Sequence, residues 1–367
     1  MLSSLLPGGP VSEIPFPARY WHRLDNGKVQ CDLCPHQCKL KEGQRGLCFT
    51  RANHHDAMVL HSYGRSSGFC VDPIEKKPLN HFLPGTAVLS FGTAGCNLSC
   101  KFCQNWDMSK SREMDTLASS ASPEVLAAAC LQTKCRSIAY TYNDPVIFLE
   151  YAVDVAQACK EVGVKSIAVS AGYISAEPRA EFFQNMHATN IDLKGFDETF
   201  YKKVCGGQLA VVKETLEYLV KETAVWVEVT NLIIPGINDS AAELERMCQW
   251  FVETLGGNIP LHFSAFHPDF KMMDKTVTPL ATLLMARKIA LQAGIKHVYA
   301  GNVDHTESGS SYCSNCHKLV IERNFYQLGQ WHLDPDGNCD FCGQAMPGVF
   351  EAVPGSWGAK RQLLKFT

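Results

Sequence analysis

The stretch that decides the fold is a short apolar run followed closely by three cysteines. Residues 87–103 read Ala87-Val88-Leu89-Ser90-Phe91-Gly92-Thr93-Ala94-Gly95-Cys96-Asn97-Leu98-Ser99-Cys100-Lys101-Phe102-Cys103. The first five residues have the composition of a buried strand, and the glycines that follow end it. The cysteines then come with C-x3-C-x2-C spacing. This triad, Cys96, Cys100 and Cys103, predicts a metal centre just beyond the end of a strand.

Similar apolar runs alternate with amphipathic helical stretches from about residue 86 to residue 300. This alternation predicts βα units around a parallel sheet. Between the strands, Ser122-Pro123 and Thr278-Pro279 predict helix starts, while Gly163 and Gly294 predict helix ends. Six or seven strands fall short of the eight in a closed barrel, so the sequence predicts an α/β partial barrel. The expected strands are residues 87–91, 137–141, 166–169, 190–193, 225–234, 260–263 and 297–300.

The chain of 367 residues is long enough for a barrel-sized core with a small module at each end. Residues 1–84 are rich in Cys, Gly, Pro and His and show little periodicity, which predicts a cysteine-rich module folded around a metal rather than an apolar core. Residues 85–305 form the predicted partial barrel. Residues 306–367 form a second cysteine module, entered through an expected linker at residues 307–311.

The charge balance argues against several classes of partner. Lys and Arg number 34 against 37 Asp and Glu, for a formal net charge of -3. Such a chain presents no polycationic surface for nucleic acid or anionic lipid. The opening segment Met1–Pro7 lacks a positively charged start, and no apolar run is long enough to span a bilayer. We therefore expect a cytoplasmic protein that binds neither nucleic acid nor a membrane.

Seventeen cysteines in a chain with no expected export signal favour metal ligation over disulfides. Besides the triad, two groups of four stand near the ends of the chain. The N-terminal group could hold zinc or a second iron–sulfur cluster, and a structural metal such as zinc is slightly favoured. The C-terminal group consists of two C-x2-C pairs separated by 22 residues, which predicts a zinc-ribbon-like module. An iron–sulfur cluster is the alternative. Residues Cys313–His317 also match a haem-attachment pattern, but the second C-x2-C pair disfavours haem. We call these groups the N-terminal cysteines, which are Cys31, Cys34, Cys38 and Cys48, and the C-terminal cysteines, which are Cys313, Cys316, Cys339 and Cys342.

The triad resembles the motif of the radical S-adenosylmethionine superfamily, since Phe102 precedes its last cysteine and it follows the first strand of a βα array. The resemblance implies a 4Fe-4S cluster with one open iron that binds S-adenosylmethionine. Reductive cleavage then gives a 5′-deoxyadenosyl radical, which abstracts hydrogen from a substrate that the sequence does not identify. A reducing partner of the flavodoxin or ferredoxin type is implied as well. Three thiolates that leave one iron open suit this chemistry, and a zinc knuckle missing a ligand is the alternative.

A second motif resembles the branch that contains the glycyl-radical-enzyme activases. Tyr140-Thr141-Tyr142-Asn143-Asp144-Pro145 ends the second strand and resembles a Tyr-Asn-Glu-Pro signature, which implies that residues 142–144 bind S-adenosylmethionine. Asp144 stands where the signature has Glu, so its reach is shorter. A turn before a helix is the structural alternative. Ser170 and Gly172 close the third strand, where barrel enzymes place ligand contacts.

Three further residues are candidates for catalysis. Asp192 and Lys194 alternate onto one face of the fourth strand, and the Asp-Leu-Lys pattern resembles one that contacts S-adenosylmethionine or substrate in activases. A surface ion pair is the alternative. Residues 234–239 resemble the Val-Pro-Gly-x-x-Asp stretch of the same branch. His267 follows the sixth strand and resembles a histidine near the cofactor, although a lone histidine is often structural.

The segment before the barrel resembles the radical enzyme of the AmmeMemoRadiSam system, through the spacing of the N-terminal cysteines and through residues 72–79, Asp-Pro-Ile-Glu-Lys-Lys-Pro-Leu. That resemblance implies companion proteins of the Memo and AMMECR types. Glu75, Lys76 and Lys77 could equally be a solvated charge run. Two other functions stay open at this point: an activase that installs a glycyl radical on a partner, and an iron–sulfur electron carrier or metal-binding adaptor that does not cleave S-adenosylmethionine.

Overall fold

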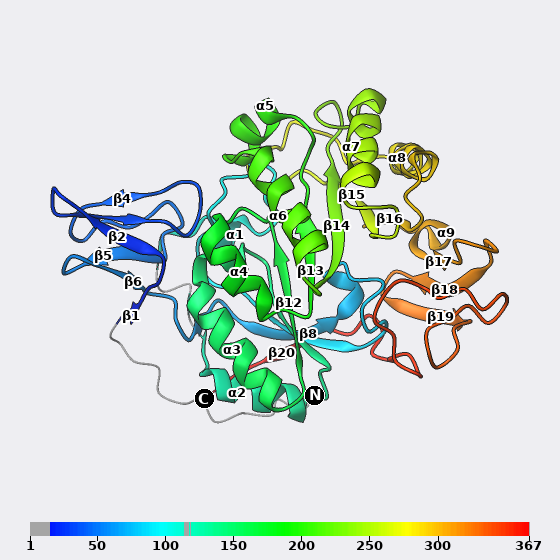
Figure 1. The fold of residues 1–367 in the computed structure, drawn as a ribbon, viewed down its shortest axis with the longest axis horizontal. Helices are drawn as coiled ribbons and strands as arrows, with labels where there is room; N and C mark the ends of the chain where they lie inside the picture. The colour runs from blue at the N-terminus through cyan, green and yellow to red at the C-terminus, as the bar shows by residue number, and fades with distance from the viewer. Residues whose placement is uncertain (1–14, 114–116, 118, 367) are drawn as a thin grey trace.

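The computed structural model describes residues 15–113, 117 and 119–366, and a nine-stranded sheet lies at its centre (Figure 1). The strand order is β16-β15-β14-β13-β12-β11-β9-β8-β20. All pairings from β9 to β16 are parallel, which confirms the predicted parallel array. The ends of the predicted strands differ from the observed ones by no more than two residues. The parallel strands are β9 (Ala87–Phe91), β11 (Ser137–Tyr140), β12 (Lys165–Ser170), β13 (Ala188–Asp192), β14 (Trp226–Ile233), β15 (Leu261–Ala265) and β16 (Val298–Gly301).

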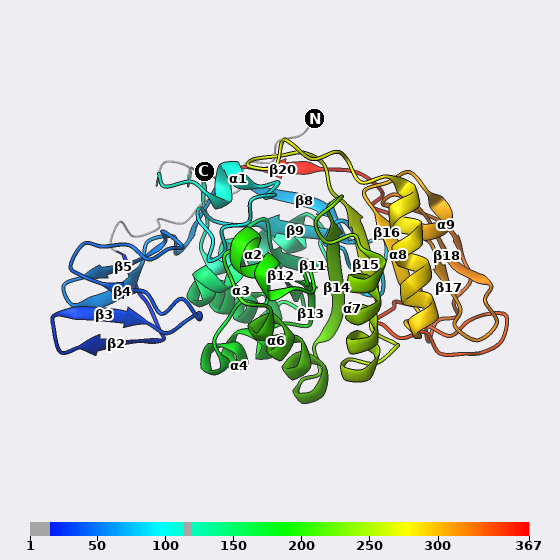
Figure 2. The same ribbon diagram turned by 90° about the horizontal axis from the view of Figure 1, so that it is seen from above.

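Helices connect successive parallel strands and pack on one side of the sheet (Figures 1 and 2). Each buries an apolar stripe; in α7 this stripe is Leu244, Met247, Cys248 and Phe251, spaced at one helical face. The long helices are α2 (Pro123–Gln132), α3 (Leu149–Glu161), α4 (Ala176–Gln184), α6 (Leu209–Glu222), α7 (Ala241–Thr254) and α8 (Leu280–Ala293). Shorter turns are η1 (Ile74–Lys76), α1 (Trp106–Ser109), η3 (Pro145–Phe148), α5 (Glu198–Phe200), η4 (Tyr201–Cys205) and α9 (Thr306–Gly309).

The predicted helix ends are mostly confirmed. Ser122 caps α2 by accepting a hydrogen bond from the backbone of Val125, and Gly294 ends α8 with a φ of 108°. The prediction that Thr278 caps α8 is wrong, because Pro279 occupies that position. The Thr278 hydroxyl instead donates to the carbonyl of Ile233 at 2.6 Å and so ties the loop before α8 to the end of β14.

Two antiparallel strands extend the sheet beyond the parallel array. β8 (Phe69–Pro73) pairs with β9, and β20 (Gln362–Leu364) pairs with β8. Both lie outside residues 85–305, so the sheet draws strands from all three predicted parts of the chain, and the division at residues 84 and 305 stays a prediction. With β16 at one edge and β20 at the other, the sheet is open.

The N-terminal segment forms two three-stranded sheets at one end of the molecule (Figures 1 and 2). The prediction that it lacks an apolar core is wrong, because Val29, Leu33 and Leu60 are buried within the main hydrophobic cluster. The opening residues 1–14, on which the expectation of no export signal rests, lie outside the described residues. The strands are β1 (Phe16–Pro17), β2 (Trp21–Leu24), β3 (Lys28–Cys31), β4 (Lys39–Leu40), β5 (Arg51–His54) and β6 (Ala57–Leu60), followed by β7 (Arg65–Ser66), which pairs with β10 (Ser119–Ser120).

The C-terminal module lies at the opposite end and is built on β17 (Ser311–Tyr312), β18 (Leu319–Asn324) and β19 (Gln327–Trp331) (Figures 1 and 2). The expected linker at residues 307–311 is wrong. Ser310 and Ser311 are buried, and their hydroxyls accept hydrogen bonds from the backbone and side chain of Arg323, at 3.0 and 2.7 Å. These serines therefore belong to the packed module rather than to a linker before it.

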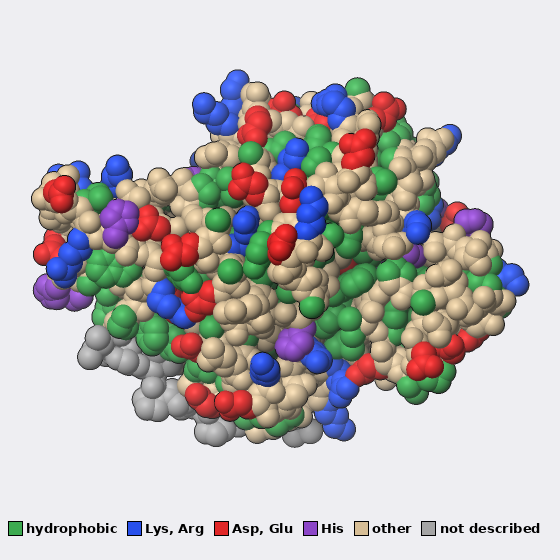
Figure 3. All heavy atoms as spheres, in the orientation of Figure 1, with side chains coloured by type: hydrophobic (Ala, Val, Ile, Leu, Met, Phe, Trp, Pro, Cys, Tyr) green, Lys and Arg blue, Asp and Glu red, His purple; other side chains and the backbone are tan. Residues whose placement is uncertain are grey.

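Basic and acidic side chains are interspersed over the face shown in Figure 3, and neither sign dominates it. This agrees with the small formal net charge of -3. Among the helices of the described residues, none is long and apolar enough to cross a membrane.

Candidate active site

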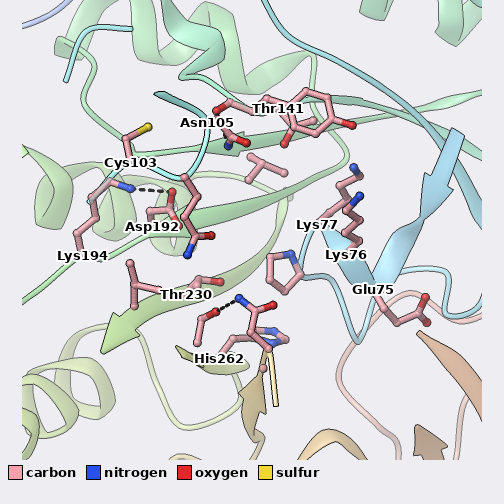
Figure 4. Close-up of a pocket in the computed structure, with 18 of the residues that line it drawn as sticks. Glu75, Lys76, Lys77, Cys103, Asn105, Thr141, Asp192, Lys194, Thr230 and His262 are labelled. Carbon is pink, nitrogen blue, oxygen red and sulfur yellow. Dashed lines mark hydrogen bonds and ion pairs between the residues drawn. The ribbon is translucent and has the colours of Figure 1, made fainter. Parts of the chain in front are cut away.

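A cavity of about 560 Å³ opens at the carboxyl ends of the parallel strands, and all three cysteines of the triad line it. Because parallel strands end at the same edge of a sheet, each strand from β11 to β16 brings a side chain or backbone atom to this cavity. The contributing positions along successive strands are Thr141, Ala171, Asp192, Thr230, Ser264 and Gly301. Cys103 and Lys194 lie on one side of the cavity and Glu75, Lys76 and Lys77 on the other (Figure 4).

Backbone hydrogen bonds hold the loop that carries the triad against η4. The amide of Ser99 donates to the carbonyl of Cys205 at 2.8 Å, and the amide of Lys101 donates to that of Val204 at 3.0 Å. Gly206 has a φ of 75°, and a Cβ there would lie 2.0 Å from Oγ of Ser99, so glycine is required by both conformation and space. The loop therefore has little freedom, and the three thiols are preorganised.

The thiols of the triad differ in their proton affinity. Burial raises the pKa of Cys96 to about 12, whereas a hydrogen bond with Cys205 lowers the pKa of Cys100 to about 6. Cys103 places Sγ 3.0 Å from Oγ of Ser109. Since thiolates are the form that binds metal, loading this site has to release at least the Cys96 proton.

The residues predicted to bind S-adenosylmethionine are brought together at the end of β11. Asp144 lines the cavity, and its carboxylate accepts hydrogen bonds from the Ser170 hydroxyl at 2.9 Å and from the amides of Val146 and Ala171. Burial raises the pKa of Asp144 to about 6. Asp144 also caps η3, as the structural alternative for this motif predicted. Asp144 is thus placed both to contact a ligand in the cavity and to cap η3.

The neighbours of Asp144 either line the cavity themselves or support the Asp144 carboxylate from behind. Tyr142 and Asn143 line the cavity, but the Asn143 side chain is bound to the backbone of Thr93 and Gly95, at 3.1 and 2.7 Å. Ser170 and Gly172 do not line the cavity. The amide of Gly172 donates to Oγ of Ser170 at 3.0 Å, which in turn donates to Asp144. Ser170 and Gly172 therefore lie behind the Asp144 carboxylate, on the side away from the cavity.

Asp192 and Lys194 face each other inside the cavity, where Nζ of Lys194 lies 3.0 Å from Oδ2 of Asp192 (Figure 4). The Lys194 side chain is only 14% exposed, so the surface ion pair considered as the alternative is wrong. Nζ also lies 5.8 Å from the centre of the Phe102 ring, which lines the cavity beside the triad. His267 is exposed and does not line the cavity, so the structure does not bring it to the other predicted catalytic residues.

The opposite wall holds a buried ionic network. Lys77 is 2% exposed and lies 2.8 Å from Asp72, which also accepts a hydrogen bond from the hydroxyl of Tyr142 at 2.8 Å. Burial raises the pKa of Asp72, but Lys77, Tyr142 and Lys76 together lower it by more, so the carboxyl stays ionised well below its usual range. The alternative of a solvated charge run at residues 75–77 is therefore wrong, because both Glu75 and Lys77 are buried.

Several residues of this cavity were missed by the sequence analysis. Arg323, Phe325, Tyr326 and Arg361 come from the C-terminal module and line the same cavity as the triad. His262, which also lines it, is paired with the buried Glu228 at 2.6 Å. No local pattern marks the C-terminal residues, because only the docking of the module brings them to the barrel.

The three cysteine groups differ in how far apart their sulfur atoms stand. The C-terminal cysteines place all four Sγ atoms within 4.8 Å of one another, with separations of 3.6 Å for Cys313–Cys342 and 3.7 Å for Cys316–Cys339. Among the described residues no other set of three or more potential ligands is so tight, so the triad and the N-terminal cysteines are more widely spaced. The N-terminal cysteines surround a second, small cavity.

Comparisons with known proteins identify the family. The Radical SAM superfamily matches residues 91–251. The uncharacterized protein MJ0808 of Methanocaldococcus jannaschii is 40% identical over 328 residues, covering 89% of this chain and 97% of that protein. A pyruvate formate-lyase-activating enzyme of Clostridium pasteurianum is 24% identical over 173 residues, covering 45% of this chain and 68% of that enzyme.

Among solved structures, Streptococcus suis SuiB bound to S-adenosylmethionine is 11% identical, with a TM-score of 0.47 over 62% of this chain and 53% of that one, and this likeness is too weak to add to the assignment. The family match covers the triad and the strands β11 to β14, whose ends line the cavity. The chain belongs to the radical SAM superfamily.

Proposed function

We propose that this chain cleaves S-adenosylmethionine at a 4Fe-4S cluster held by Cys96, Cys100 and Cys103, and that the carbon radical formed abstracts hydrogen from a substrate in the same cavity. The observation that carries the proposal is the cavity itself, which joins the triad to the strand ends and to the C-terminal module. The family implies the cluster and the cofactor. Three thiols that are too widely spaced for one ion fit a cuboidal cluster with an open corner.

The chain's own residues supply positioning and protection. The Asp192–Lys194 pair presents two fixed opposite charges beside the triad, and the buried Asp144 carboxylate offers an acceptor at the end of the next strand but one. Once bound, the cluster and S-adenosylmethionine supply the electron transfer and bond cleavage. The surrounding walls keep water from the reactive centre.

The size of the cavity favours a small substrate over a peptide loop. About 560 Å³ is within the range of small-molecule sites, and S-adenosylmethionine takes part of it. Phe325 and Tyr326, at the turn between β18 and β19, line the far end. The activase alternative requires space for a peptide loop of a partner protein, which the cavity volume favours less than a small molecule.

The C-terminal cysteines form, in our proposal, a structural zinc site. Four thiolates around one zinc at about 2.3 Å stand about 3.8 Å apart in a tetrahedron. The observed separations of 3.6 and 3.7 Å support this assignment.

The deciding experiment measures 5′-deoxyadenosine after anaerobic reconstitution with iron and sulfide and reduction with dithionite. Wild type should form it from S-adenosylmethionine, and the variant Cys96→Ala/Cys100→Ala/Cys103→Ala should not. The control is Cys248→Ala, which removes a buried cysteine of α7 that belongs to none of the three cysteine groups and should keep the activity. Absence of the product from a wild type that contains its cluster would overturn the proposal in favour of an electron carrier or adaptor.

A further inference from the structure

The N-terminal cysteines enclose a site of their own beside the triad loop. All four are free thiols, and all four line the same small cavity. Two of the sulfur atoms flank Gly46, where a Cβ would lie 3.8 Å from Sγ of Cys38 and 3.7 Å from Sγ of Cys48. Leu33 and Leu40 form part of the wall. Four thiols that converge on an apolar cavity are a ligand set rather than a group of scattered core residues.

Arg51 indicates that the occupant of this cavity is an anion. The side chain is 1% exposed and lines the cavity. Its terminal nitrogens are bound to the carboxylate of Glu150 and to the carbonyl of Arg19, but Nε has no hydrogen-bond partner. A buried donor left unpaired costs about 1–3 kcal/mol, so a partner in the cavity is expected. A metal centre with four thiolates is negatively charged and supplies such an acceptor.

The spacing of the sulfur atoms decides which metal centre fits. Around a single zinc, the thiolates of a tetrahedral site stand about 3.8 Å apart. The C-terminal cysteines meet this condition, whereas no three of the N-terminal cysteines, all of them described, have Sγ atoms within 4.8 Å of one another. A cluster spreads its metal ions over several corners, so its thiolates stand farther apart. The prediction that slightly favoured zinc here therefore gives way to iron–sulfur.

The N-terminal site touches the triad loop directly. His36 lines the N-terminal cavity, and its Nε2 lies 2.7 Å from the carbonyl oxygen of Asn97, the residue after Cys96. On the other side, the carbonyl of Cys48 packs against Gly95, where a Cβ would lie 1.9 Å from its oxygen. Only glycine permits this approach. A single loop thus separates the two cysteine groups.

We propose that Cys31, Cys34, Cys38 and Cys48 hold an iron–sulfur cluster that passes electrons to the triad site. The metal assignment stands by itself, while the relay role rests on the function proposed above. In each transfer a low-potential one-electron donor of the ferredoxin or flavodoxin type is oxidised by one electron, the N-terminal cluster accepts and then releases that electron, and the triad site is reduced by one. The relay cluster returns to its starting state, and no proton is transferred.

The test uses the full chain with Cys96, Cys100 and Cys103 all changed to Ala, which leaves the N-terminal module unaltered. After anaerobic reconstitution, we expect this variant to retain about half of the wild-type iron, with matching sulfide and one zinc. Its dithionite-reduced form should give an electron paramagnetic resonance signal. A chain without iron, or with two zinc ions, would overturn the metal assignment.

The relay is tested by the same spectrum in the wild type, where two reduced clusters separated by one loop should broaden each other's signals. The variant Cys34→Ser/Cys38→Ser should lose this broadening and about half of the iron but keep its zinc. If that variant does not fold, the triad variant still decides, because its single signal should be narrower than those of the wild type. Two independent narrow signals in the wild type would overturn the relay. If the triad variant contains iron but the wild type forms no 5′-deoxyadenosine, only the proposed function is refuted. The assignment of an iron–sulfur cluster to the N-terminal cysteines would still stand.

Discussion

Lys194 keeps its charge in a place where burial opposes it. Burial lowers the pKa of Lys194, but the Asp192 carboxylate and the Cys100 thiol raise it by more, so the pKa stands well above its usual value. Nζ is 3.0 Å from Asp192, and the side chain is mostly enclosed. The cavity therefore presents a fixed cation beside the triad at neutral pH.

Glu75 on the opposite wall makes a prediction about pH. Burial raises the pKa of Glu75 to about 7 from its usual value of 4.5, and the ionised form is thus disfavoured in the folded chain. The stabilisation of the folded state that comes from the protonated carboxyl is complete below pH 4.5 and is lost as the pH rises through about 7. In Glu75→Gln, the side chain is always neutral and can still accept from the amide of Gly85, as Oε1 does at 2.7 Å.

The unfolding free energy of Glu75→Gln relative to wild type should therefore increase by on the order of 3 kcal/mol between pH 4.5 and 7. Denaturant titrations of the two proteins at a series of pH values measure this difference, in which the contributions of all other titrating groups cancel. A difference that is independent of pH would show that Glu75 is ionised in the folded protein and paired with Arg323, whose Nε lies 3.9 Å away.

At the scale of elements, one ion pair fastens the N-terminal sheets to the barrel. Arg51 on β5 and Glu150 on α3 are 1% and 0% exposed and make two hydrogen bonds, at 2.9 and 3.0 Å. Glu150→Ala leaves a buried guanidinium without its counter-ion, and we expect a loss of about 3–5 kcal/mol in the unfolding free energy. Chemical denaturation of the anaerobically loaded protein measures the loss.

Two further variants test whether the unpaired charge of Arg51 causes this loss of stability. Glu161→Ala removes an exposed carboxylate from the same helix and should change stability by no more than about 0.5 kcal/mol. Arg51→Met/Glu150→Leu removes both charges and should be more stable than Glu150→Ala alone. If the double variant is as unstable as the single one, packing rather than the unpaired charge accounts for the loss.

Local patterns predicted the elements whose positions depend on nearby residues. The seven parallel strands, the Ser122 cap and the Gly294 helix end all follow from short-range periodicity or backbone preference. Thr278 was misplaced by one residue because its hydroxyl binds the carbonyl of Ile233, 45 positions away. His267 satisfied the motif yet points to solvent, since a strand-end position alone does not fix the direction of a side chain.

Contacts distant in sequence were beyond the reach of such patterns. Nη2 of Arg323 donates to the carbonyl of Asn80 at 2.6 Å, although 243 residues separate them, and β20 completes the sheet beside β8. Neither the C-terminal wall of the cavity nor the small void among the N-terminal cysteines has a signature in residue spacing. Both arise only when separate parts of the chain pack together.

At the scale of the whole molecule, the C-terminal module is a wall of the active site that needs support. Its own buried core consists of Cys313, Val320, Ile321, Leu333, Cys339 and Met346, two of which are proposed zinc ligands. A core of this size does not hold a fold by itself, so a metal is needed to stabilise it. Loss of the metal should therefore remove Arg323, Phe325 and Tyr326 from the cavity that they line.

We accordingly expect Cys316→Ser to reduce zinc from about one ion per chain to none, and to increase amide hydrogen exchange across β17–β19 while the parallel strands stay protected. The matched control is His317→Asn, which changes the exposed residue next to Cys316 and suits its φ of 60°. Mass spectrometry of exchange resolves the two regions in each variant. Because the triad is untouched, iron should be retained. Unchanged exchange in zinc-free Cys316→Ser would mean that docking onto the rest of the chain, through contacts such as Arg323–Asn80 at 2.6 Å, holds the module without its metal.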